Sequence, residues 1–422
     1  MKRIAIVGSG IAGLACAHFL HRRAEITLYE RNDYAGGHTN TVSVCEGAES
    51  VPIDTGFMVF NQVTYPNLTR LFEELDVPIK PAPMSFSVQH MPAGLEYCGT
   101  SLNHLFAQRK NLLRPRFWAM LRQINRFNTD AVRILDSGRA DEIALGDYVR
   151  KNRYGDDFLN FYLVPMSSAV WSTPPELMLE FPAGTLLRFF HNHGFLGLHT
   201  QHPWFTVVNG AKTYVEKITR PFLEKIRLRR GATAVVRKSK EVSVTDAGGE
   251  AESFDQVILA SHADESLRLL ADASAEERAL LGEFKYQSNT ALLHTDASVM
   301  PKTKLCWASW NYRIASDGEG KTVPSTIYWM NSLQGVSQQR NYFVSVNGEN
   351  CVDPKLILKR INYEHPLFSL GAIRAQKRLP ELNTAGGSVC FCGSYFRYGF
   401  HEDAFTSALE LCRTLTGERL MA

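Results

Sequence analysis

The sequence lacks any long apolar run and carries little net charge. No hydrophobic stretch reaches the roughly 20 residues needed to span a bilayer. Glycines and a strand pattern interrupt the apolar first residues, MKRIAIVGSGIAGLACAHFL, which is untypical of a secretory signal peptide. A formal net charge of +3 over 422 residues is too small to indicate nucleic acid binding. With 45% hydrophobic and 21% charged residues, the composition is ordinary for a soluble globular enzyme, which we expect to be cytoplasmic.

The eight cysteines are scattered, and no pair of them has zinc-finger spacing. Cys390 and Cys392 alternate along one expected strand, which favours thiols packed in the core over a metal site. Reduced cysteines in the cytoplasm are the simplest interpretation. The sequence has no internal repeat and no low-complexity segment, so we expect globular units with mass for about two or three domains.

A dinucleotide-binding pattern opens the sequence, in the order strand, glycine turn, helix and strand. The first strand is predicted over 2–7, the helix over 11–20 and the second strand over 26–29, and Glu30 follows directly. A lone G-x-G-x-x-G is weak support for such a site. Here the strand, the helix, the second strand and the terminal acid all agree with it.

Each glycine of the G-x-G-x-x-G turn has its own physical role. Gly8 makes the tight turn, Gly10 lets a pyrophosphate approach the backbone, and Gly13 lets the helix meet the sheet. The positive end of the helix then faces the phosphates. Glu30 is placed to accept hydrogen bonds from a ribose diol. The pattern therefore predicts a dinucleotide cofactor at the start of the helix.

A second glycine pair, Gly36-Gly37, follows the acid within the stretch RNDYAGGHTNTV. A nicotinamide enzyme has no need of such a pair, whereas the longer FAD lies under this loop in flavoproteins. The stretch resembles the E-x-x-x-x-x-G-G-R segment of the flavin amine oxidase and phytoene desaturase superfamily. His38 stands where that family usually has arginine, so the resemblance implies a phosphate contact that depends on pH.

Further segments extend the resemblance along nearly the whole chain. The stretch VPIDTGFMVF over 51–60 resembles a D-x-G-x-x-V segment that runs beside the flavin ring. The stretch VVNGAKTYVEKI over 207–218 resembles a second glycine turn with its helix, although asparagine replaces one glycine. In the family, a residue near Ala232 contacts adenine through its backbone. The strand DQVILAS usually ends in A-x-P, and here Ser261 and His262 stand there instead.

The C-terminal stretch GFHEDAFTSAL begins at Gly399 and reads as the start of a helix. It aligns without a gap with the family's closing motif G-Y-M-E-G-A-x-x-S-G. The helix N-terminus of that motif points at the flavin and stabilises negative charge on the reduced ring. Asp403 stands where the family often has glycine, and we expect it to cap the helix or to bond the ribityl chain. Phe400 takes the place of an aromatic-cage tyrosine and is the candidate for the substrate face.

The resemblance implies an α/β fold in which a Rossmann-like FAD-binding domain is discontinuous and carries an inserted substrate domain, as in amine oxidases. We place the FAD-binding domain at 1–65, 205–290 and 385–422, and the α+β substrate domain at 66–204 and 291–384. The stretches YPNLTRLFEEL and LGDYVRKN have helical periods, whereas STIYWMNSL and YFVSVN read as strands. Non-covalent FAD is the implied cofactor. Its expected contacts are Gly8, Ser9, Gly10, Ile11, Ala12, Gly13, Glu30, Arg31, Gly36, Gly37, His38, Thr39, Gly56, Phe57, Met58, Ala232, Gly393, Ser394, His401, Glu402, Asp403 and Ala404.

Four histidines, His191, His193, His199 and His202, lie close together in HNHGFLGLHTQH. A zinc site would need a clean pair, a third ligand and an open position, and these histidines are mixed with phenylalanine, leucine and glycine. Structural histidines are the preferred interpretation, and a polar lining of the substrate cavity is the alternative. No metal site is predicted.

A basic and aromatic segment covers 105–135. Its cations are set against one acid, Asp130, and large apolar residues interleave with them, which is typical of an interfacial helix. The cations are Arg109, Lys110, Arg114, Arg116, Arg122, Arg126 and Arg133. A solvated basic face over a core face is the preferred interpretation. Peripheral contact with an anionic membrane, at its inner face, is the alternative.

The expected function is that of an FAD-dependent oxidoreductase that oxidises an apolar substrate by hydride transfer to flavin N5. The combination of GGHTNT, FFHNHGFL and GSYFRYGFHED looks closest to a bacterial subgroup associated with cyclopropane-fatty-acid-synthase-like enzymes. That likeness implies desaturation of a methyl-branched or unsaturated fatty acyl chain. An amine oxidase and a redox-neutral isomerase of polyunsaturated fatty acids are the alternatives. Many amine oxidases of this family hold a water near N5 with a lysine, for which Lys285, Lys302 and Lys304 are candidates.

Overall fold

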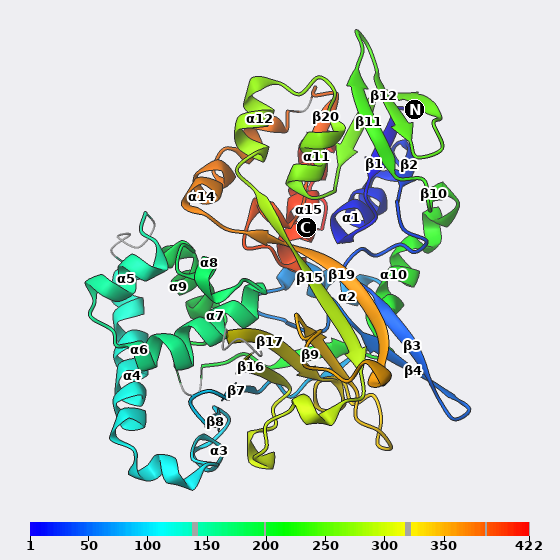
Figure 1. Cartoon of the computed structure of the whole chain (residues 1–422). Coiled ribbons are helices and arrows are strands. Elements are labelled where there is room, and N and C mark those ends of the chain that lie inside the picture. The colour runs from blue at the N-terminus through cyan, green and yellow to red at the C-terminus, as the bar shows by residue number, and fades with distance from the viewer. Residues whose placement is uncertain (137–141, 198–199, 317–321, 385, 422) are drawn as a thin grey trace.

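The computed structural model describes the chain except residues 137–141, 198–199, 317–321, 385 and 422. Two large sheets dominate the molecule, and the chain passes repeatedly between them (Figure 1). The first strand and the last helix lie on the same side of the molecule, so the end of the chain returns to the part of the molecule in which it began.

The smaller of the two large sheets is parallel throughout and takes strands from distant parts of the chain. Its strands, in spatial order, are β10 (Ile226–Arg227), β2 (Glu25–Tyr29), β1 (Arg3–Val7), β14 (Gln256–Leu259) and β20 (Val389–Phe391). Helices cover both faces of a parallel sheet, so its strands are largely apolar. β14 and β20 are buried along their whole length. The bounds predicted for β1 and β2 are correct to within one residue.

Helices α1 (Ile11–Leu20) and α15 (His401–Thr416) pack against each other and share one core with this sheet. The prediction of a helix over 11–20 is confirmed at both ends. A Cβ on Gly13 would lie 1.9 Å from the carbonyl oxygen of Gly8. Only glycine therefore lets α1 come this close to the turn that follows β1.

The larger sheet is antiparallel except for one parallel pair, β7 with β16. Its strands, in spatial order, are β19 (Ile357–Leu367), β15 (Lys285–His294), β18 (Phe343–Val346), β17 (Thr322–Trp329), β16 (Trp310–Ser316), β7 (Phe86–His90) and β8 (Leu95–Cys98). β15 and β19 pair over nearly their full length and reach toward the parallel sheet, as Figure 1 shows. One end of this long pair therefore stands between the two sheets.

Smaller sheets and helices surround the two large sheets. The remaining strands are β3 (Thr41–Glu46) with β4 (Glu49–Asp54), β5 (Phe60–Asn61) with β9 (Trp204–Val207) and β6 (Ile79–Pro81), and β11 (Ala232–Arg237) with β12 (Val242–Asp246) and β13 (Ala251–Phe254). The remaining helices are α2 (Pro66–Glu74), α3 (Leu102–Leu105), α4 (Pro115–Asp136), α5 (Leu145–Lys151), α6 (Asp156–Phe158), α7 (Val164–Trp171), α8 (Pro175–Met178), α9 (Ala183–Asn192), α10 (Lys212–Thr219), α11 (Ala263–Leu269), α12 (Ala275–Leu281), α13 (Met330–Leu333) and α14 (Leu370–Gln376). In the described chain, none of the helices has both the length and the apolar character needed to cross a membrane.

Most elements predicted outside the first sheet are confirmed. YPNLTRLFEEL forms α2, LGDYVRKN forms α5 and YFVSVN forms β18. The single strand predicted for STIYWMNSL is wrong at its end, because β17 stops at Trp329 and α13 follows. The Asn331 amide binds the backbone of the next loop at Ser337, Arg340 and Tyr342, which ends the strand. Cys390 and Cys392 are buried free thiols, as predicted.

Several contacts cross the proposed domain boundaries. α2 contacts α15, where the Glu402 carboxylate accepts from the backbone N–H groups of Asn67 and Leu68. α14 contacts α12, and β15 pairs with β19 from its first residue. The division into 1–65, 205–290 and 385–422 for one domain remains a prediction, and these contacts show that the two parts share elements at their border.

Candidate active site

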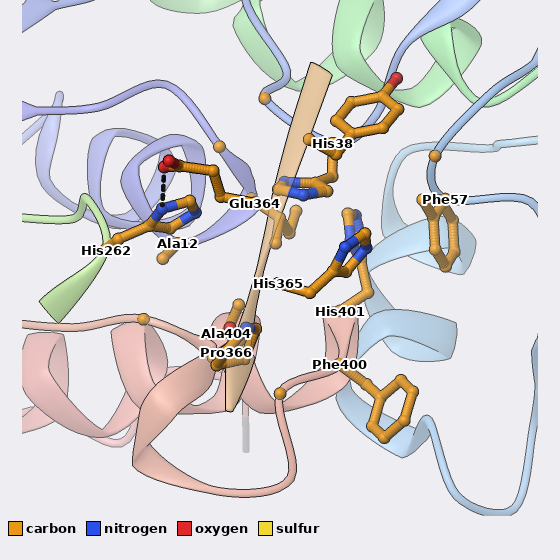
Figure 2. Close-up of a pocket in the computed structure, with 18 of the residues that line it drawn as sticks. Ala12, His38, Phe57, His262, Glu364, His365, Pro366, Phe400, His401 and Ala404 are labelled. Carbon is orange, nitrogen blue, oxygen red and sulfur yellow. Dashed lines mark ion pairs between the residues drawn. The ribbon is translucent and has the colours of Figure 1, made fainter. Parts of the chain in front are cut away.

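A cavity of about 640 Å³ lies between the two large sheets and is lined by residues from the whole length of the chain. Its volume is in the range of cofactor-binding and ligand-binding cavities. The glycine turn and the start of α1 form one end, and aromatic residues of α7, α9 and β16 form the other. Figure 2 shows part of its wall, where His365 of β19 reaches toward the side on which His401 and Phe57 stack.

The glycine turn leaves the space that a phosphate group needs. A Cβ on Gly10 would meet no atom within 4 Å, so the backbone there opens into the cavity. The second glycine pair approaches it closely, because a Cβ on Gly37 would lie 3.0 Å from the Cα of Gly10. Gly10 is also the N-cap of α1, and no side chain caps that helix. This end of the cavity therefore fits the diphosphate of a dinucleotide.

Glu30 is buried at the end of β2, where the glycine turn holds its carboxylate. Oε2 accepts from the backbone nitrogen of Ser9 at 3.0 Å and from its hydroxyl at 2.5 Å. Oε1 accepts from the backbone nitrogen of Asn32 at 2.8 Å. Oε2 already accepts two bonds, whereas Oε1 keeps a further acceptor site, and Glu30 lines the cavity, so its geometry fits a hydroxyl of the ribose. The residues around the turn thus fit FAD.

The structure brings most of the predicted cofactor residues onto the wall of this one cavity. They are Gly8, Ser9, Gly10, Ile11, Ala12, Glu30, Arg31, Gly36, Gly37, His38, Gly56, Phe57, Met58, Ala232, Gly393, Ser394, His401 and Ala404, and Phe400 joins them. Gly13, Thr39, Glu402 and Asp403 do not line the cavity. That the residues of the wall bind FAD remains a prediction.

Glu402 and Asp403, the two acids at the start of α15, form bonds within the protein. The Glu402 carboxylate accepts from the backbone nitrogens of Asn67 at 3.0 Å and Leu68 at 2.9 Å, which caps the start of α2. Oδ2 of Asp403 accepts from the backbone nitrogen of Phe400 at 2.9 Å, which is the capping role, one of the two expected for it. Burial raises the pKa of Asp403 to about 7. The geometry gives no support to the expected contacts of these two acids with FAD.

His401, the first residue of α15, is a neutral and tightly held side chain. Its ring stacks on Phe57 with 3.9 Å between the centroids, and its Nε2 lies 2.6 Å from the hydroxyl of Tyr214. Thr39 bonds the same hydroxyl, which explains why Thr39 lies behind the wall. Burial lowers the pKa of His401 to about 3. The favourable potential for an anion at this wall therefore comes from the end of α15 and not from a charged imidazole.

His38 stands in the cavity wall among other imidazoles. Its ring stacks on Tyr363 with 4.9 Å between the centroids, and the rings of His365 and His262 lie 5.5 Å and 6.0 Å away. Burial, followed by the neighbouring histidines, lowers the pKa of His38 well below its usual value. An imidazole that stays neutral changes no charge near neutral pH. The pH-dependent phosphate contact expected from the sequence is therefore not supported there.

The sequence did not indicate the wall that β19 and the turn after β14 contribute. Tyr363, Glu364 and His365 follow one another on β19, and all three line the cavity. His262 stacks on Tyr286 with 4.3 Å between the centroids and pairs with Glu364 at 3.5 Å (Figure 2). The departure from the A-x-P pattern at His262 could have indicated that this residue belongs to the site. β19 carries no motif, because only its pairing with β15 brings it to the cavity.

In the described chain, one group of three residues has the composition of a metal site: His262, Glu265 and Glu364, whose ligand atoms lie within 4.8 Å of one another. Arg31 pairs with Glu265 at 2.5 Å, and His262 pairs with Glu364. These ion pairs account for the grouping without an ion.

The histidine-rich segment is structural in the part of it that is described. The ring of His193 is buried and stacks on Phe189 with 3.9 Å between the centroids, and its Nδ1 donates to the carbonyl oxygen of Phe189 at 2.9 Å. Burial lowers the pKa of His193 to about 4. His191 is exposed and His202 is partly exposed, whereas His199 lies outside the described residues.

The three candidate lysines point to solvent. Lys285 and Lys302 are exposed, and Lys304 is exposed with its Nζ 3.5 Å from the ring centroid of Trp307. None of them lines the cavity, and no other lysine among the described residues does. None of the three therefore fits the expected role of holding a water at the flavin.

The half of the cavity that faces the larger sheet is apolar and aromatic. Its walls are formed by Val59, Tyr65, Met84, Val170, Trp171, Ser172, Phe189, Phe195, Trp204, Trp310, Tyr328 and Val346. Phe400 completes this wall, and its ring stacks on Phe189 with 4.9 Å between the centroids. Among the described residues of 59–204 and 310–346 that line the cavity, none carries a charged side chain.

The sequence matches a family of flavoproteins. A family model described as flavin containing amine oxidoreductase matches residues 11–338. A stretch of 76 residues is 37% identical to 15-cis-phytoene desaturase from Synechococcus elongatus. That match covers 18% of this chain and 15% of the desaturase, so it concerns only a small part of either protein.

Solved structures share the fold over almost the whole chain. Wild-type putrescine oxidase bound to putrescine has a TM-score of 0.68 at 13% identity, with 99% of each chain covered. The CLA-producing fatty acid isomerase from P. acnes has a TM-score of 0.65 at 13% identity, with 97% of each chain covered. The predicted fold class, a Rossmann-like domain combined with a substrate domain, is confirmed. Identities this low establish the fold and no substrate.

Alanine at Gly10 should weaken FAD binding, whereas alanine at Gly13 should lower the stability of the fold. Gly10→Ala places its methyl group in open space, so we expect a folded protein whose FAD affinity falls at least tenfold because the methyl group blocks the diphosphate. Gly13→Ala drives the methyl group into the Gly8 carbonyl, which should destabilise the fold by about 1–3 kcal/mol. Urea unfolding and FAD titration measure the two effects. Wild-type FAD affinity in Gly10→Ala would contradict the assignment of the diphosphate site.

Glu30→Ala should weaken FAD binding if the carboxylate holds the ribose. It removes a charge-assisted hydrogen bond worth about 1.5–3 kcal/mol, so the dissociation constant should rise roughly 10- to 100-fold. Ser9→Ala is the matched control, because it removes one bond to the same carboxylate and leaves the acid in place. Calorimetric titration with FAD should show a much smaller loss for Ser9→Ala. Equal losses would mean that Glu30 acts only by holding the turn.

Proposed function

This chain belongs to the family of flavin-containing amine oxidoreductases, and we propose that it acts within this family as a desaturase of a fatty acyl chain. It is an FAD-dependent oxidoreductase, as the family match establishes. Bound FAD supplies the oxidising chemistry by accepting a hydride at N5. The proposal concerns the substrate, a methyl-branched or unsaturated acyl chain, and the residues that hold it.

The apolar half of the cavity is the observation that carries the proposal. Burying a hydrocarbon chain against such a wall is favourable by about 0.8 kcal/mol per CH₂ group. The same wall would remove water from an ammonium group without offering a carboxylate in exchange, which costs free energy. The described residues of 59–204 and 310–346 that line the cavity offer no such carboxylate. The wall therefore favours an acyl chain over an amine.

Phe400 supports the same choice. Its ring stacks on Phe189 and lies 6.0 Å from the ring of Trp171, so three aromatic rings hold one another in place at the substrate face. A phenyl ring offers apolar contact, whereas the phenol of a tyrosine would orient an amine through its oxygen and its electron-rich face. These rings would exclude water and align the acyl chain.

The imidazoles of His365 and His401 are poor bases for an amine substrate. An amine must lose its proton before hydride transfer. Burial lowers the pKa of His365 to about 4 and that of His401 to about 3, so neither imidazole holds a proton taken from an ammonium group. The candidate lysines lie outside the cavity, as described above. Removal of hydride from a hydrocarbon needs no such preliminary deprotonation. The carbocation that hydride loss leaves is strongly acidic, so water can take the second hydrogen from the neighbouring carbon as a proton, which forms the double bond.

Redox-neutral isomerisation of a polyunsaturated fatty acid is the second candidate on the same wall. Its support is that the CLA-producing fatty acid isomerase from P. acnes shares this fold and, by its name, acts on a fatty acid. Both reactions need an apolar channel beside the flavin. They differ in whether the cofactor stays reduced after one turnover.

The corner formed by α3 and α4 supports a route for the substrate from a membrane. Leu102, Leu113 and Trp118 are 75%, 88% and 44% exposed there. The exposed cations Lys110 and Arg122 lie in the same segment, which is the composition of a surface that binds anionic lipids. α4 stands at the outer edge of the molecule (Figure 1). Peripheral contact through this corner would bring the protein to acyl chains.

Anaerobic mixing with candidate substrates tests the proposed substrate class. Lipids with unsaturated or methyl-branched chains should bleach the flavin absorbance, whereas mono- and polyamines should not, because the described residues of 59–204 and 310–346 that line the cavity offer no counter-charge. Stopped-flow absorbance measures both, and mass spectrometry of the lipid identifies a loss of two hydrogens. A rearranged lipid of unchanged mass with oxidised flavin would indicate the isomerase. Rapid bleaching by an amine alone would contradict the proposal.

Flotation with vesicles tests the membrane contact. The protein should float with vesicles that contain phosphatidylglycerol and much less with pure phosphatidylcholine, since the cations contribute about 1 kcal/mol each. The double variant Leu113→Glu, Trp118→Glu should lose at least tenfold of this binding. Leu223→Glu is the control, because Leu223 is 63% exposed in another part of the molecule. Equal binding by the double variant and the control would exclude this corner.

A further inference from the structure

His365 connects the cavity with a set of buried amides in the larger sheet. It is paired with Gln287 across β19 and β15, and its side chain is part of the cavity wall. Its Nδ1 lies 2.8 Å from Nδ2 of Asn289, a side chain that is 1% exposed. Within the described chain, no polar atom is paired with Nε2 of His365, so this nitrogen is available to a ligand.

A backbone group fixes the direction of the hydrogen bonds that end at this imidazole. The backbone N–H of Thr290 can only donate, and it donates to Oδ1 of Asn347 at 3.2 Å. Asn347 therefore turns its Nδ2 toward Oδ1 of Asn289, at 2.6 Å. Asn289 in turn directs its own Nδ2 at Nδ1 of His365. Because an amide accepts on one side and donates on the other, Nδ1 is the acceptor and the ring proton sits on Nε2.

A second donor holds Asn289 in the same orientation. Nε2 of Gln287 lies 3.1 Å from Oδ1 of Asn289, so this oxygen accepts twice. A reversed Asn289 amide would face two donors with its NH₂ group in a buried site. Burial also lowers the pKa of His365 to about 4, and His262 nearby adds to the cost of a second proton. The ring therefore carries a single proton near neutral pH.

We propose that His365 donates its Nε2–H to an acceptor atom of the bound flavin ring, and that Asn289 and Asn347 are positioning residues that keep the proton on that nitrogen. The chemistry of the cavity identifies the acceptor. The diphosphate is placed at the glycine turn and the hydrocarbon part of an acyl chain offers no acceptor, whereas a flavin ring between them carries ring nitrogens and carbonyl oxygens. A neutral donor stabilises the negative charge that reduction places on the ring, and so raises its reduction potential. This inference requires FAD in this cavity and is independent of the substrate.

The position of the proton is tested on the wild-type protein loaded with FAD. Uniform ¹⁵N labelling of histidine, with His365→Phe used to assign the signal, should show a protonated Nε2 and an unprotonated Nδ1. Asn289→Leu removes the donor to Nδ1, so the proton should then be shared between both nitrogens. A wild-type proton on Nδ1, or an unchanged pattern in Asn289→Leu, would overturn the positioning role.

The reduction potential of the bound flavin tests the contact itself. His365→Phe should shift the two-electron equilibrium about tenfold toward oxidised flavin, which corresponds to about 30 mV, and Asn289→Leu should shift it in the same direction by less. His294→Phe is the control, because His294 is a fully buried imidazole at the other end of β15 and does not line the cavity. An unchanged potential in FAD-loaded His365→Phe contradicts the inference. Wild-type protein that binds no FAD would instead contradict the premise that FAD occupies the cavity.

Discussion

The close contact between α1 and the turn after β1 is the constraint on which the cofactor end of the cavity depends. There is no room for a methyl group on Gly13, which would lie 1.9 Å from the Gly8 carbonyl. The contact sets the direction in which the N-terminus of α1 points. It also sets the position of Ser9, which holds the carboxylate of Glu30. The places for a diphosphate and for a ribose thus follow from one packing contact.

The start of α15 joins this end of the cavity to the substrate side. α15 packs against α1, and its Glu402 caps α2 through two backbone N–H groups. Phe400, the residue before the helix, stacks on Phe189 of α9. Because one helix start makes all of these contacts, a displacement of it would move the cofactor wall and the substrate wall together. The last segment of the chain therefore contributes to both walls of the cavity.

Along the cavity, the character of the wall changes from charged through neutral polar to apolar. Glu30 and Arg31 stand at the dinucleotide end, the imidazoles of His38 and His365 stand between, and the aromatic wall follows. Burial keeps these imidazoles neutral, so hydrogen bonds and helix ends supply the electrostatics where the two halves meet. The hydrogen bonds that lead from Thr290 through Asn347 and Asn289 to His365 also involve neutral groups only, and they determine which ring nitrogen carries the proton.

The sequence by itself predicted the cofactor half of the cavity. Backbone geometry forms the place for a dinucleotide, and the local spacing of the glycines determines that geometry. Gly8, Gly10 and Glu30 were readable for that reason, as were the bounds of α1. Only the tertiary structure decided the rest of the site. Asn289 and His365 are 76 residues apart and meet through the pairing of β15 with β19, which no motif announces. Glu402 lies within a recognisable motif, yet packing turns it to α2. Contacts between distant segments determine which side chains line a cavity, and the local sequence does not predict those contacts.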